Sequence, residues 1–507
     1  SSSSAASDVY KRQLLCSFLV SLPTGCARLD LDPYNYASEN TSFKNKRDAE
    51  MWVNGMYNAL RDYNQGQQMY ASDLQADYLN AAAGAMEKLP DMHRWSTFAS
   101  SEHATASIWK ERFLIIQDIN TGIKGFPNIP EQSEIQELTG ALYLGRAYCY
   151  TYLVTHFCKP YNSSTAATDL GLPLLTAPTL KNFPPRSSVA ETYDFILSDI
   201  QKAETLLANQ TGAAGADTFT LDAARALKAR VLLYKNDWAQ AYQVAVALIN
   251  TNRYPLATSA DAFKKIWTED DNTESIIQLY AGVNAGVYET SDNTNELYLG
   301  ESESFFFPGQ IDANPNVLPT KDFIDLFTTD DWRKDVFLKE VTVGFSSLYA
   351  VNKYPRNREL EPIDSYNFYY GHKAKLFRIA ETYLIAAEAA YKNNDETNAK
   401  KYLNLLRAAR GLSAITTSGS NLFSDIQNER NRELAFEDFR LYDLNRWGLP
   451  VKRGTPQDVT AIRNTPASDY SELNIQVGSN YYYKIVWPIP VDDIDYEQGN
   501  WKQNSNW

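Results

Sequence analysis

Apolar side chains recur at every third or fourth position from Val189 to Leu207. This spacing places them along one face of an α-helix. Ser188 stands just before the run and Glu191 follows three residues later, which makes the Ser-x-x-Glu capping box that opens many helices. Leu138–Phe157 is a further candidate helix upstream. The pattern therefore predicts two helices in this part of the chain.

Two segments have the pattern of helix pairs joined by a short polar turn. Leu221–Tyr234 and Trp238–Asn250 form the first pair, and Leu376–Gly411 contains the second, with its glycine placed to end the last helix. Both first helices end in Tyr-Lys-Asn, and their Ala residues let two helices approach closely. Such units are typical of degenerate tetratricopeptide repeats. We therefore predict a mainly α fold on a tetratricopeptide-like helix-turn-helix scaffold.

The predicted repeat pairs lie near residues 138–250 and 376–448, and their uneven spacing excludes a simple solenoid. A weakly periodic insertion, roughly 251–371, separates them and is rich in Asn, Asp, Gly, Tyr and Phe. Loops of this length in a compact domain are usually functional. We expect a short strand or a buried anchor at Phe305–Pro308 inside it, and the tail from 454 to 507 is again loop-rich.

The first 25 residues have the features of a secretory signal. Lys11-Arg12 precede the apolar run Leu14–Leu22, which is too short to span a bilayer because a span takes about 20 residues. The run leads into Pro-Thr-Gly-Cys26, which resembles a bacterial lipobox in which Cys26 is acylated and becomes the first mature residue. Pro23 departs from the usual aliphatic residue, so a cleaved signal with an incidental Cys is the alternative.

Ser1–Val9 has no initiating Met and does not resemble the basic start of a signal, so it is left out of the fold prediction. We expect residues 1–25 to be removed and residues 26–507 to form a single domain. If this is so, any attachment to a membrane depends on lipid at Cys26.

Composition narrows the class of ligand. The formal net charge is −14, and no Lys/Arg-rich tract offsets it, so a nucleic-acid backbone would be repelled. A neutral ligand such as a sugar is indifferent to that field. Aromatic residues make up 13% of the chain and include 33 Tyr, whose apolar faces and polar tips suit a wet binding surface.

The usual signatures of metal, nucleotide and triad chemistry are missing from the sequence. The four His form no HExxH, and neither a Gly-rich phosphate loop nor a Gly-x-Ser-x-Gly elbow occurs. No CxxC occurs either, and we expect Cys149 and Cys158 to be small buried residues. We therefore expect no cofactor and no metal.

Carboxylate pairs need separate attention because glycosidases use two acids. Glu381 and Glu388 are two turns apart on one helix face, roughly 10 Å between Cα atoms, which approaches the separation in inverting enzymes. Both lie in an Ala-rich packing helix, so we favour buried acids that are satisfied by neighbouring Arg or backbone groups. Asp330-Asp331 and Asp492-Asp493 are interpreted as solvated turn acids.

A dense charged segment follows, with Glu429 and Arg432, and Glu437 and Arg440, at i,i+3 spacing along one predicted helix. Such pairs add only about 0.2–0.5 kcal/mol each on a helix surface. We expect the cluster to lock this helix against its neighbours.

This segment also carries a family resemblance. Ile426–Gly448, with its Glu-Arg-x-Arg-Glu-Leu-Ala-Phe-Glu core, resembles the C-terminal signature of the SusD/RagB family. Phe377–Ala389 and Asn404–Leu412 are similar to the family's repeat helices, and Trp487–Pro490 with the Asn and Gln residues after it is similar to its closing segment.

The sequence departs from the family pattern at two places. Asp438 stands where Gly is usual, and Ser505 stands where Pro is usual. We expect neither to contact ligand.

The resemblance implies a lipoprotein on the outer face of the outer membrane, where it forms a lid on a SusC-like TonB-dependent transporter. Its ligand would usually be a glycan, and in some branches a peptide, and it would not be an enzyme. An all-helical glycoside hydrolase and a bare interaction scaffold are the other readings. The family's conserved residues are structural, so the resemblance assigns no binding residue.

Candidate ligand contacts must therefore come from residue chemistry. Sugar capture needs flat aromatic faces together with fixed polar groups that select hydroxyls. Aromatic and polar residues of this kind occur in two non-periodic stretches of the chain. The candidates are Asp73, Trp95, Tyr280, Asn284, Tyr288 and Tyr298.

We hypothesise that Trp95 and Tyr288 help to form one sugar platform. A Trp95→Ala, Tyr288→Ala double variant is therefore expected to bind glycan more weakly when titrated in a calorimeter. Unchanged affinity would rule out this platform.

Overall fold

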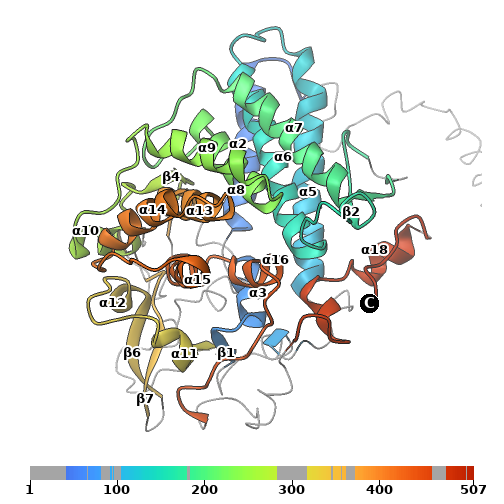
Figure 1. The fold of residues 1–507 in the computed structure, drawn as a ribbon. Coiled ribbons are helices and arrows are strands. Elements are labelled where there is room, and N and C mark those ends of the chain that lie inside the picture. The colour runs from blue at the N-terminus through green and yellow to red at the C-terminus, as the bar shows by residue number, and fades with distance from the viewer. Residues whose placement is uncertain are drawn as a thin grey trace, which may run out of the picture. The chain divides into compact units, whose positions relative to one another are not determined.

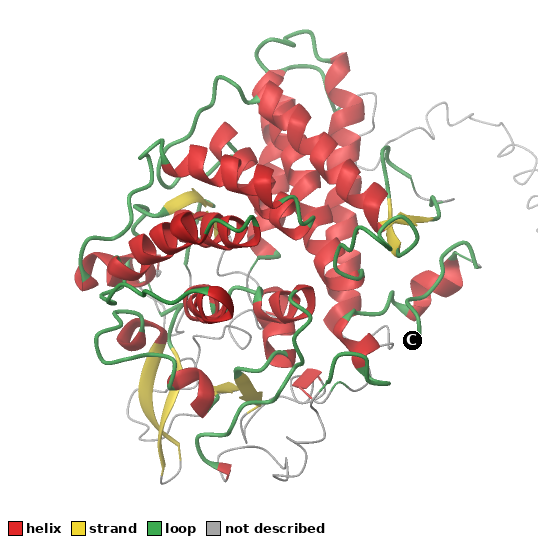
Figure 2. Cartoon of the chain, in the orientation of Figure 1, coloured by secondary structure: helices red, strands yellow, loops and turns green. Residues whose placement is uncertain are grey.

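The structure, a computed structural model, is mainly helical, as predicted (Figures 1 and 2). The helices Gln136–Phe157 and Val189–Leu206 follow the predicted apolar runs, whereas Lys46–Asp62 and Ala104–Gly125 are helices that the sequence analysis did not predict. It describes residues 42–64, 67–81, 92–93, 95, 104–179, 183–281, 317–343, 346–355, 357–360, 372–459, 475–497 and 499–507. Asn45–Trp507 forms one compact unit, to which the account below refers, and Ser1–Lys44 is a separate unit.

The described part of the chain contains long helices, short helical turns and short strands. The longer helices are α2 (Lys46–Asp62), α3 (Gln67–Gln75), α5 (Ala104–Gly125), α6 (Gln136–Phe157), α7 (Val189–Leu206), α8 (Leu221–Tyr234), α9 (Trp238–Ile249), α10 (Ala260–Thr268), α13 (Ile379–Lys392), α14 (Glu396–Ala408) and α15 (Gly419–Leu434). The short ones are α11 (Lys321–Ile324), α12 (Lys334–Phe337), α16 (Arg440–Arg446), α18 (Val491–Tyr496) and the 3-10 turns η1 (Phe126–Asn128), η4 (Arg358–Leu360) and η6 (Tyr482–Ile485).

The strands form four antiparallel pairs, β1 with β5, β2 with β3, β4 with β8 and β6 with β7. Their bounds are β1 (Leu79–Ala81), β2 (Leu170–Pro173), β3 (Arg186–Ser188), β4 (Ser275–Gln278), β5 (Val317–Pro319), β6 (Leu338–Val343), β7 (Ser346–Val351) and β8 (Lys375–Arg378).

Helix boundaries follow the capping residues of the sequence. Ser188 opens α7 as predicted, because its hydroxyl accepts from the Glu191 N–H at 3.1 Å and the Glu191 carboxylate accepts from the Ser188 N–H at 2.8 Å. Gly411 lies just beyond α14 with a φ of 78°, a conformation that only glycine adopts without strain. Both predicted boundaries are confirmed.

The two predicted helix pairs are confirmed, and they share one turn structure. The turn between α8 and α9 has Asn236 at φ 63°, and the turn between α13 and α14 has Asn394 at φ 61°. The next residue caps the second helix in each case: Asp237 accepts from the Gln240 N–H, and Asp395 from the Asn398 N–H. The structurally equivalent residues of the two turns are therefore the Asn-Asp dipeptides. Relative to these, the Tyr-Lys-Asn sequence of the second pair lies one residue earlier than that of the first.

The helices stack into one continuous array although the chain leaves it midway. α5, α6, α7, α8 and α9 each pack on the next, and α13 then packs directly on α9 and on α8 before α14 and α15 follow. Figure 1 shows α13 and α14 alongside α8 and α9. The residues between α9 and α13 are thus inserted into a single helical scaffold.

This insertion is more regular than its weak periodicity indicates. Its described residues include α10, strand β4, and the β6–β7 hairpin with six paired positions. β4 pairs with β8, the strand that leads into α13, so the start and the end of the insertion are held together. Phe305–Pro308, where we expect a strand or an anchor, lies outside the described residues.

A network of buried charges joins the insertion to the scaffold. The carboxylate of Glu433 in α15 accepts from three guanidinium groups: Arg410 at 2.9 Å, Arg378 at 2.8 Å and Arg333 at 3.1 Å. Arg410 also makes a two-point contact with Glu274 at 2.7 and 2.8 Å. The members of this central ion cluster are Glu274, Asp331, Arg333, Lys353, Arg378, Arg410, Glu429, Glu433 and Glu437. The prediction that these charges lock one helix against its neighbours is confirmed.

The detailed pairing differs from the prediction because the charged segment is not one helix. α15 ends at Leu434, and α16 begins only at Arg440. Glu429 and Arg432 do pair at 2.6 Å, but Glu437 contacts Lys353 and Arg378, while Arg440 pairs with Asp77. The predicted Glu437–Arg440 pair is therefore wrong, because the backbone turns between the two residues.

The interpretation of Asp331 as a solvated turn acid is also wrong. Asp331 is buried and pairs with Arg333 at 2.8 Å, so its carboxylate belongs to the central ion cluster.

Cys149 in α6 and Cys158 at the end of that helix are both buried free thiols, as predicted. Burial raises the pKa of each thiol to about 11. None of the helices in the described part of the chain is long and apolar enough to cross a membrane.

The central ion cluster predicts a specific acid sensitivity. Burial alone would raise the pKa of Glu429, but Arg333 and Arg432 outweigh it and lower the pKa to about 2. Its stabilising contribution is therefore complete above the unfolded pKa near 4.5 and is lost as pH falls towards 2. We expect Glu429→Gln to lower the free energy of unfolding by about 3 kcal/mol at neutral pH.

Urea denaturation of wild type and variant between neutral pH and pH 2.5 measures this effect, and the difference should shrink below pH 4.5. Glu50→Gln is the matched control, since Glu50 faces Lys46 at 3.8 Å on an exposed helix surface. If Glu429→Gln lowered the free energy of unfolding by no more than Glu50→Gln does, the stabilising role given to the cluster would be contradicted.

Candidate functional site

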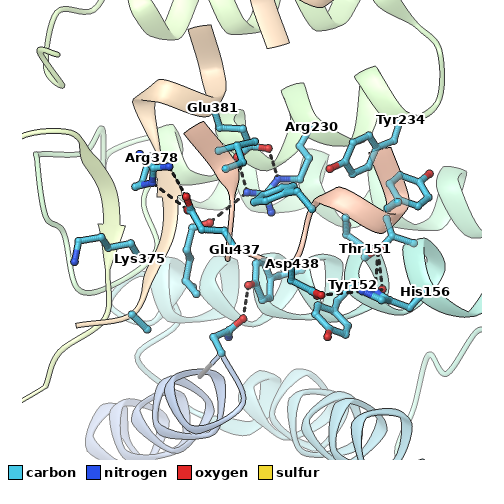
Figure 3. Close-up of a pocket in the computed structure, with 18 of the residues that line it drawn as sticks. Thr151, Tyr152, His156, Arg230, Tyr234, Lys375, Arg378, Glu381, Glu437 and Asp438 are labelled. Carbon is cyan, nitrogen blue, oxygen red and sulfur yellow. Dashed lines mark hydrogen bonds and ion pairs between the residues drawn. The ribbon is translucent and has the colours of Figure 1, made fainter. Parts of the chain in front are cut away.

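A cavity of about 110 Å³ lies where four parts of the scaffold meet (Figure 3). One wall is α6, a second is α8, a third is β8 with the start of α13, and the fourth is the turn between α15 and α16. Its side chains come from segments on both sides of the long insertion. The cavity therefore forms only once the two halves of the array have come together.

The α6 wall presents a row of hydroxyl and aromatic groups. Tyr148, Thr151, Tyr152, Thr155 and His156 all line the cavity. Their spacing of three or four residues places them on one face of the helix. The Tyr148 hydroxyl donates to the Asn64 amide oxygen at 2.5 Å, so the end of α2 is bound to this face.

The second wall carries a closed ion pair. Figure 3 shows the Arg230 guanidinium facing the Glu381 carboxylate, with two hydrogen bonds of 2.8 and 2.6 Å. Arg230 also lies over the rings of Phe377 and Phe439 at 4.8 and 5.1 Å. Burial by itself would lower the pKa of Arg230, but the charge of Glu381 raises it. The guanidinium is thus permanently charged, and its Nε and one terminal nitrogen already donate to Glu381.

The remaining charges of the wall are paired in the same way. Lys375 contacts Asp270 at 2.6 Å, and Arg378 donates to Glu437 at 3.0 Å from its Nε. Burial would raise the pKa of Asp270, but Lys375 outweighs it and lowers the pKa. The cavity therefore presents hydroxyl groups and paired charges rather than an unpaired charged side chain that could bind an ion.

Asp438 occupies the turn between α15 and α16 and has a φ of 65°, the left-handed region in which glycine is favoured. Its carboxylate contacts His156 Nε2 at 3.0 Å and accepts a hydrogen bond from the Ser72 hydroxyl. Figure 3 shows Asp438 pointing towards His156 next to Tyr152. The side chain that replaces the expected glycine thus enters the cavity, and its contacts offset the cost of the backbone conformation.

Asp438 also meets a second buried acid. Its N–H donates to the Asp73 carboxylate at 3.2 Å, and the Asp73 side chain is fully buried. Burial and the nearby Asp438 charge raise the pKa of Asp73 well above its usual range. The same causes raise the pKa of Tyr152, over whose ring Arg112 lies at 4.3 Å.

The chemistry open to this cavity is limited by its size and by its closed charges. A volume of 110 Å³ holds several water molecules, whereas sites for drug-sized ligands run from about 300 Å³ upward. Among the residues that the structure describes, no group of three or more His, Cys, Asp and Glu could hold a metal ion. We interpret it as a polar interior cavity of the scaffold that is too small for an oligosaccharide.

The two helical acids raised by the sequence are both neutralised by arginine. Glu381 is bound by Arg230, and Glu388 makes two hydrogen bonds of 2.5 and 2.7 Å with Arg446. Burial would raise the pKa of Glu388, but Arg446 lowers it. The prediction that these acids are buried and satisfied by neighbouring Arg is confirmed.

The predicted ligand residues fall in different environments. Asp73 lies in α3, where it is buried, and its carboxylate accepts a hydrogen bond from the backbone N–H of Asp438. Trp95 is 3% exposed, lies under Arg453 at 5.4 Å, and its carbonyl accepts from Lys484 at 3.0 Å. In this structure neither side chain offers a face to solvent. Because Trp95→Ala would also remove a packed ring, the double variant needs Tyr288→Ala alone as its comparison.

Tyr280 does present a free aromatic face. It follows β4, its side chain is 59% exposed, and its carbonyl accepts a hydrogen bond from Arg61 at 3.4 Å. Asn284, Tyr288 and Tyr298, like the lipid-attachment candidate Cys26, lie outside the described residues.

Sequence reasoning missed the α6 side of the cavity and Asp438. The spacing of Tyr148, Thr151, Tyr152, Thr155 and His156 was a signal for a polar helix face, although it does not reveal which helix covers that face. The departure from glycine at 438 was the second available signal, because a non-glycine residue at positive φ points to a functional or structural contact.

Comparison with known proteins adds the family. A family model described as the SusD family matches residues 339–507, and a second, described as "Starch-binding associating with outer membrane", matches residues 29–233. The two matches cover both halves of the scaffold. The chain belongs to the SusD family. Members matched by these models are carbohydrate-binding proteins, and one model associates them with the outer membrane.

Individual relatives agree with this assignment along most of the chain. A SusD-like protein of Formosa agariphila is 25% identical over 84% of this chain and 88% of its own length. A SusD superfamily protein of Bacteroides thetaiotaomicron shares the fold with a TM-score of 0.77 at 24% identity, over 91% of this chain and 100% of that one. A laminarin-binding SusD-like protein has a TM-score of 0.69 at 21% identity, over 92% and 100%.

Glu381→Gln tests whether the cavity acids are structural. The neutral amide leaves Arg230 buried without its counter-charge, so the free energy of unfolding should fall by about 3 kcal/mol or more. Any glycan affinity of the folded protein should stay within twofold of wild type. Denaturant unfolding and calorimetry measure the two quantities.

Glu269→Gln serves as the control for Glu381→Gln, because Glu269 pairs with Lys265 on an exposed surface at 3.4 Å and should cost under about 0.5 kcal/mol. A folded Glu381→Gln variant with tenfold weaker glycan binding would show instead that Glu381 contacts the ligand.

Proposed function

We propose that the protein captures a neutral oligosaccharide at the cell surface and delivers it to a SusC-like, TonB-dependent transporter in the outer membrane. In this proposal the mature chain begins at Cys26, and lipid on that residue holds it to the membrane. The observation that carries the proposal is the match of residues 29–233 to the family described as starch-binding and associating with the outer membrane.

The electrostatics of the chain support a neutral ligand. Its net charge of −14 disfavours anionic partners. In the described cavity, the charged side chains at Arg230, Lys375 and Arg378 are already paired with acids of the protein. A peptide would need charged hooks for its termini, whereas a sugar needs hydroxyl partners and apolar faces.

The pairing of Glu381 and Glu388 with arginines supports ligand capture rather than hydrolysis. A glycoside hydrolase needs two carboxyl groups that face each other across the scissile bond, one of them able to hold a proton at working pH. Glu381 and Glu388 instead point into separate arginine contacts, with Arg230 and Arg446. Because each carboxylate is engaged by its own arginine, the two do not form a facing pair of acids.

Transport also sets the strength of binding. A protein that hands its ligand to a transporter must release it, so an affinity of about micromolar to millimolar is expected, or about −8 to −4 kcal/mol. The laminarin-binding relative supports β-glucans as one class to test, and the starch-binding family description supports α-glucans.

Calorimetric titration of the Ala27–Trp507 form tests this function. We expect heat with one class of polysaccharide from a panel that contains starch, laminarin, and host and microbial glycans, and none with a peptide digest. Product analysis of the same mixtures should find no shortened chains.

Each other outcome has a definite meaning. Heat with the digest alone would replace the sugar by a peptide ligand. Shortened sugar chains would show that the protein is an enzyme. If no glycan in the panel gave heat, the proposed capture of an oligosaccharide would be rejected.

A further inference from the structure

A second, larger cavity lies away from the one described above and shares none of its lining residues. It has a volume of about 360 Å³ and is formed by three segments: 159–170 after α6, 478–486 around η6, and 504–506. The size falls at the lower end of the range of about 300–1,000 Å³ for small-molecule sites. It is large enough for a short sugar.

The walls of this cavity are fixed by hydrogen bonds to neighbouring elements. Asn504 donates both amide hydrogens, to the Phe157 and Trp487 carbonyls at 2.9 and 2.8 Å. The Tyr482 hydroxyl donates to Asn445 at 3.0 Å, which ties η6 to α16. The site is thus pre-formed rather than assembled by the ligand, which lowers the entropic cost of binding.

One polar group at the cavity makes no hydrogen bond within the protein. In the described part of the chain, the Ser479 Oγ is buried without a hydrogen-bond partner. Tyr483, Ser505 and Asn506, which also carry polar side chains, line the cavity as well. A buried hydroxyl without a partner destabilises the protein, and a ligand hydroxyl that pairs with it restores the missing hydrogen bond.

The aromatic content of the cavity complements these polar groups. Tyr482 and Tyr483 both line it, and Tyr483 is held edge-on against Trp507 with ring centroids 5.0 Å apart. Trp507 in turn donates to the Val486 carbonyl at 2.8 Å. Two oriented tyrosine rings provide apolar faces of the kind on which the C–H face of a sugar ring packs.

The charges of the cavity favour a neutral ligand over an ionic one. Among the described residues that line it, Lys159 and Asp169 carry the charges, and they bind each other at 2.9 Å. Their pairing leaves the site without net charge, so it offers no counter-ion to a phosphate, a carboxylate or an amine. What remains is a set of hydroxyls, amides and aromatic faces, which is the chemistry that recognises a neutral polyol.

We propose that this cavity is a carbohydrate subsite, which binds one end of a sugar chain or a disaccharide through Tyr483, Ser479 and Asn506. The proposal rests on the function proposed above and deepens it, because it assigns part of the captured sugar to a defined set of residues. It also gives a role to Ser505, contrary to the expectation that this residue does not contact ligand, because the proline usual at that position has no hydroxyl to offer the cavity that Ser505 lines.

Three variants of the full chain test the subsite. Ser505→Trp places an indole in the cavity, and Asn506→Gly removes an amide at a φ of 74° that glycine adopts freely. Lys502→Trp is the matched control, since Lys502 has an exposed side chain in the same tail and does not line the cavity. Maltose, laminaribiose and the polysaccharide that wild type binds are titrated by calorimetry.

We expect wild type and Lys502→Trp to bind disaccharide at one more site than Ser505→Trp does. We also expect Asn506→Gly to weaken that site threefold or more. Equal stoichiometry and affinity in all four proteins, or no disaccharide binding by wild type, would overturn the subsite. If wild type still binds the polysaccharide in that case, the capture function stands, whereas loss of polysaccharide binding by wild type itself would refute the function instead.

Discussion

The fold depends on one carboxylate, that of Glu433, which three arginines from three different parts of the chain surround. Arg333 comes from the inserted segment, Arg378 from the strand before α13, and Arg410 from the end of α14. Burial would raise the pKa of Glu433, but Arg410 and Arg378 lower it well below its usual range. A buried charge with fewer partners would destabilise the fold, so each of these elements is needed to keep the others in place.

What the sequence could predict here is what local chemistry decides. The Ser188 capping box and the Gly411 stop fix helix ends through neighbours within three or four residues, and both were predictable. The break after α15 was not, because Phe436 and Asp438 adopt positive φ without being glycine, and their compensating contacts are with Tyr78 and Ser72, far away in the chain.

The candidate site was less predictable for a related reason. A single aromatic residue in an irregular stretch carries no signal of its exposure, and Trp95 proves to be buried while Tyr280 is open. The polar cavity takes residues from helices on both sides of the insertion, so no window of sequence contains it. The cavity at the C-terminal tail is likewise built from three separated segments. Family resemblance identified the scaffold, but the positions of these groups needed the structure.

The direct packing of α13 on α9 has a consequence for how such a protein can change. The insertion between α9 and α13 has its two ends pinned by a helix contact and by the β4–β8 pair. The entropy of closing a flexible loop grows only with the logarithm of its length, by about 0.6 kcal/mol for each doubling. The stretches of the insertion that make no contact with the helical array can therefore change in length at little thermodynamic cost. The residues that reach the central ion cluster, such as Arg333, cannot be exchanged in the same way, because they neutralise Glu433. Loop length and fold stability are in this sense separable traits of one chain.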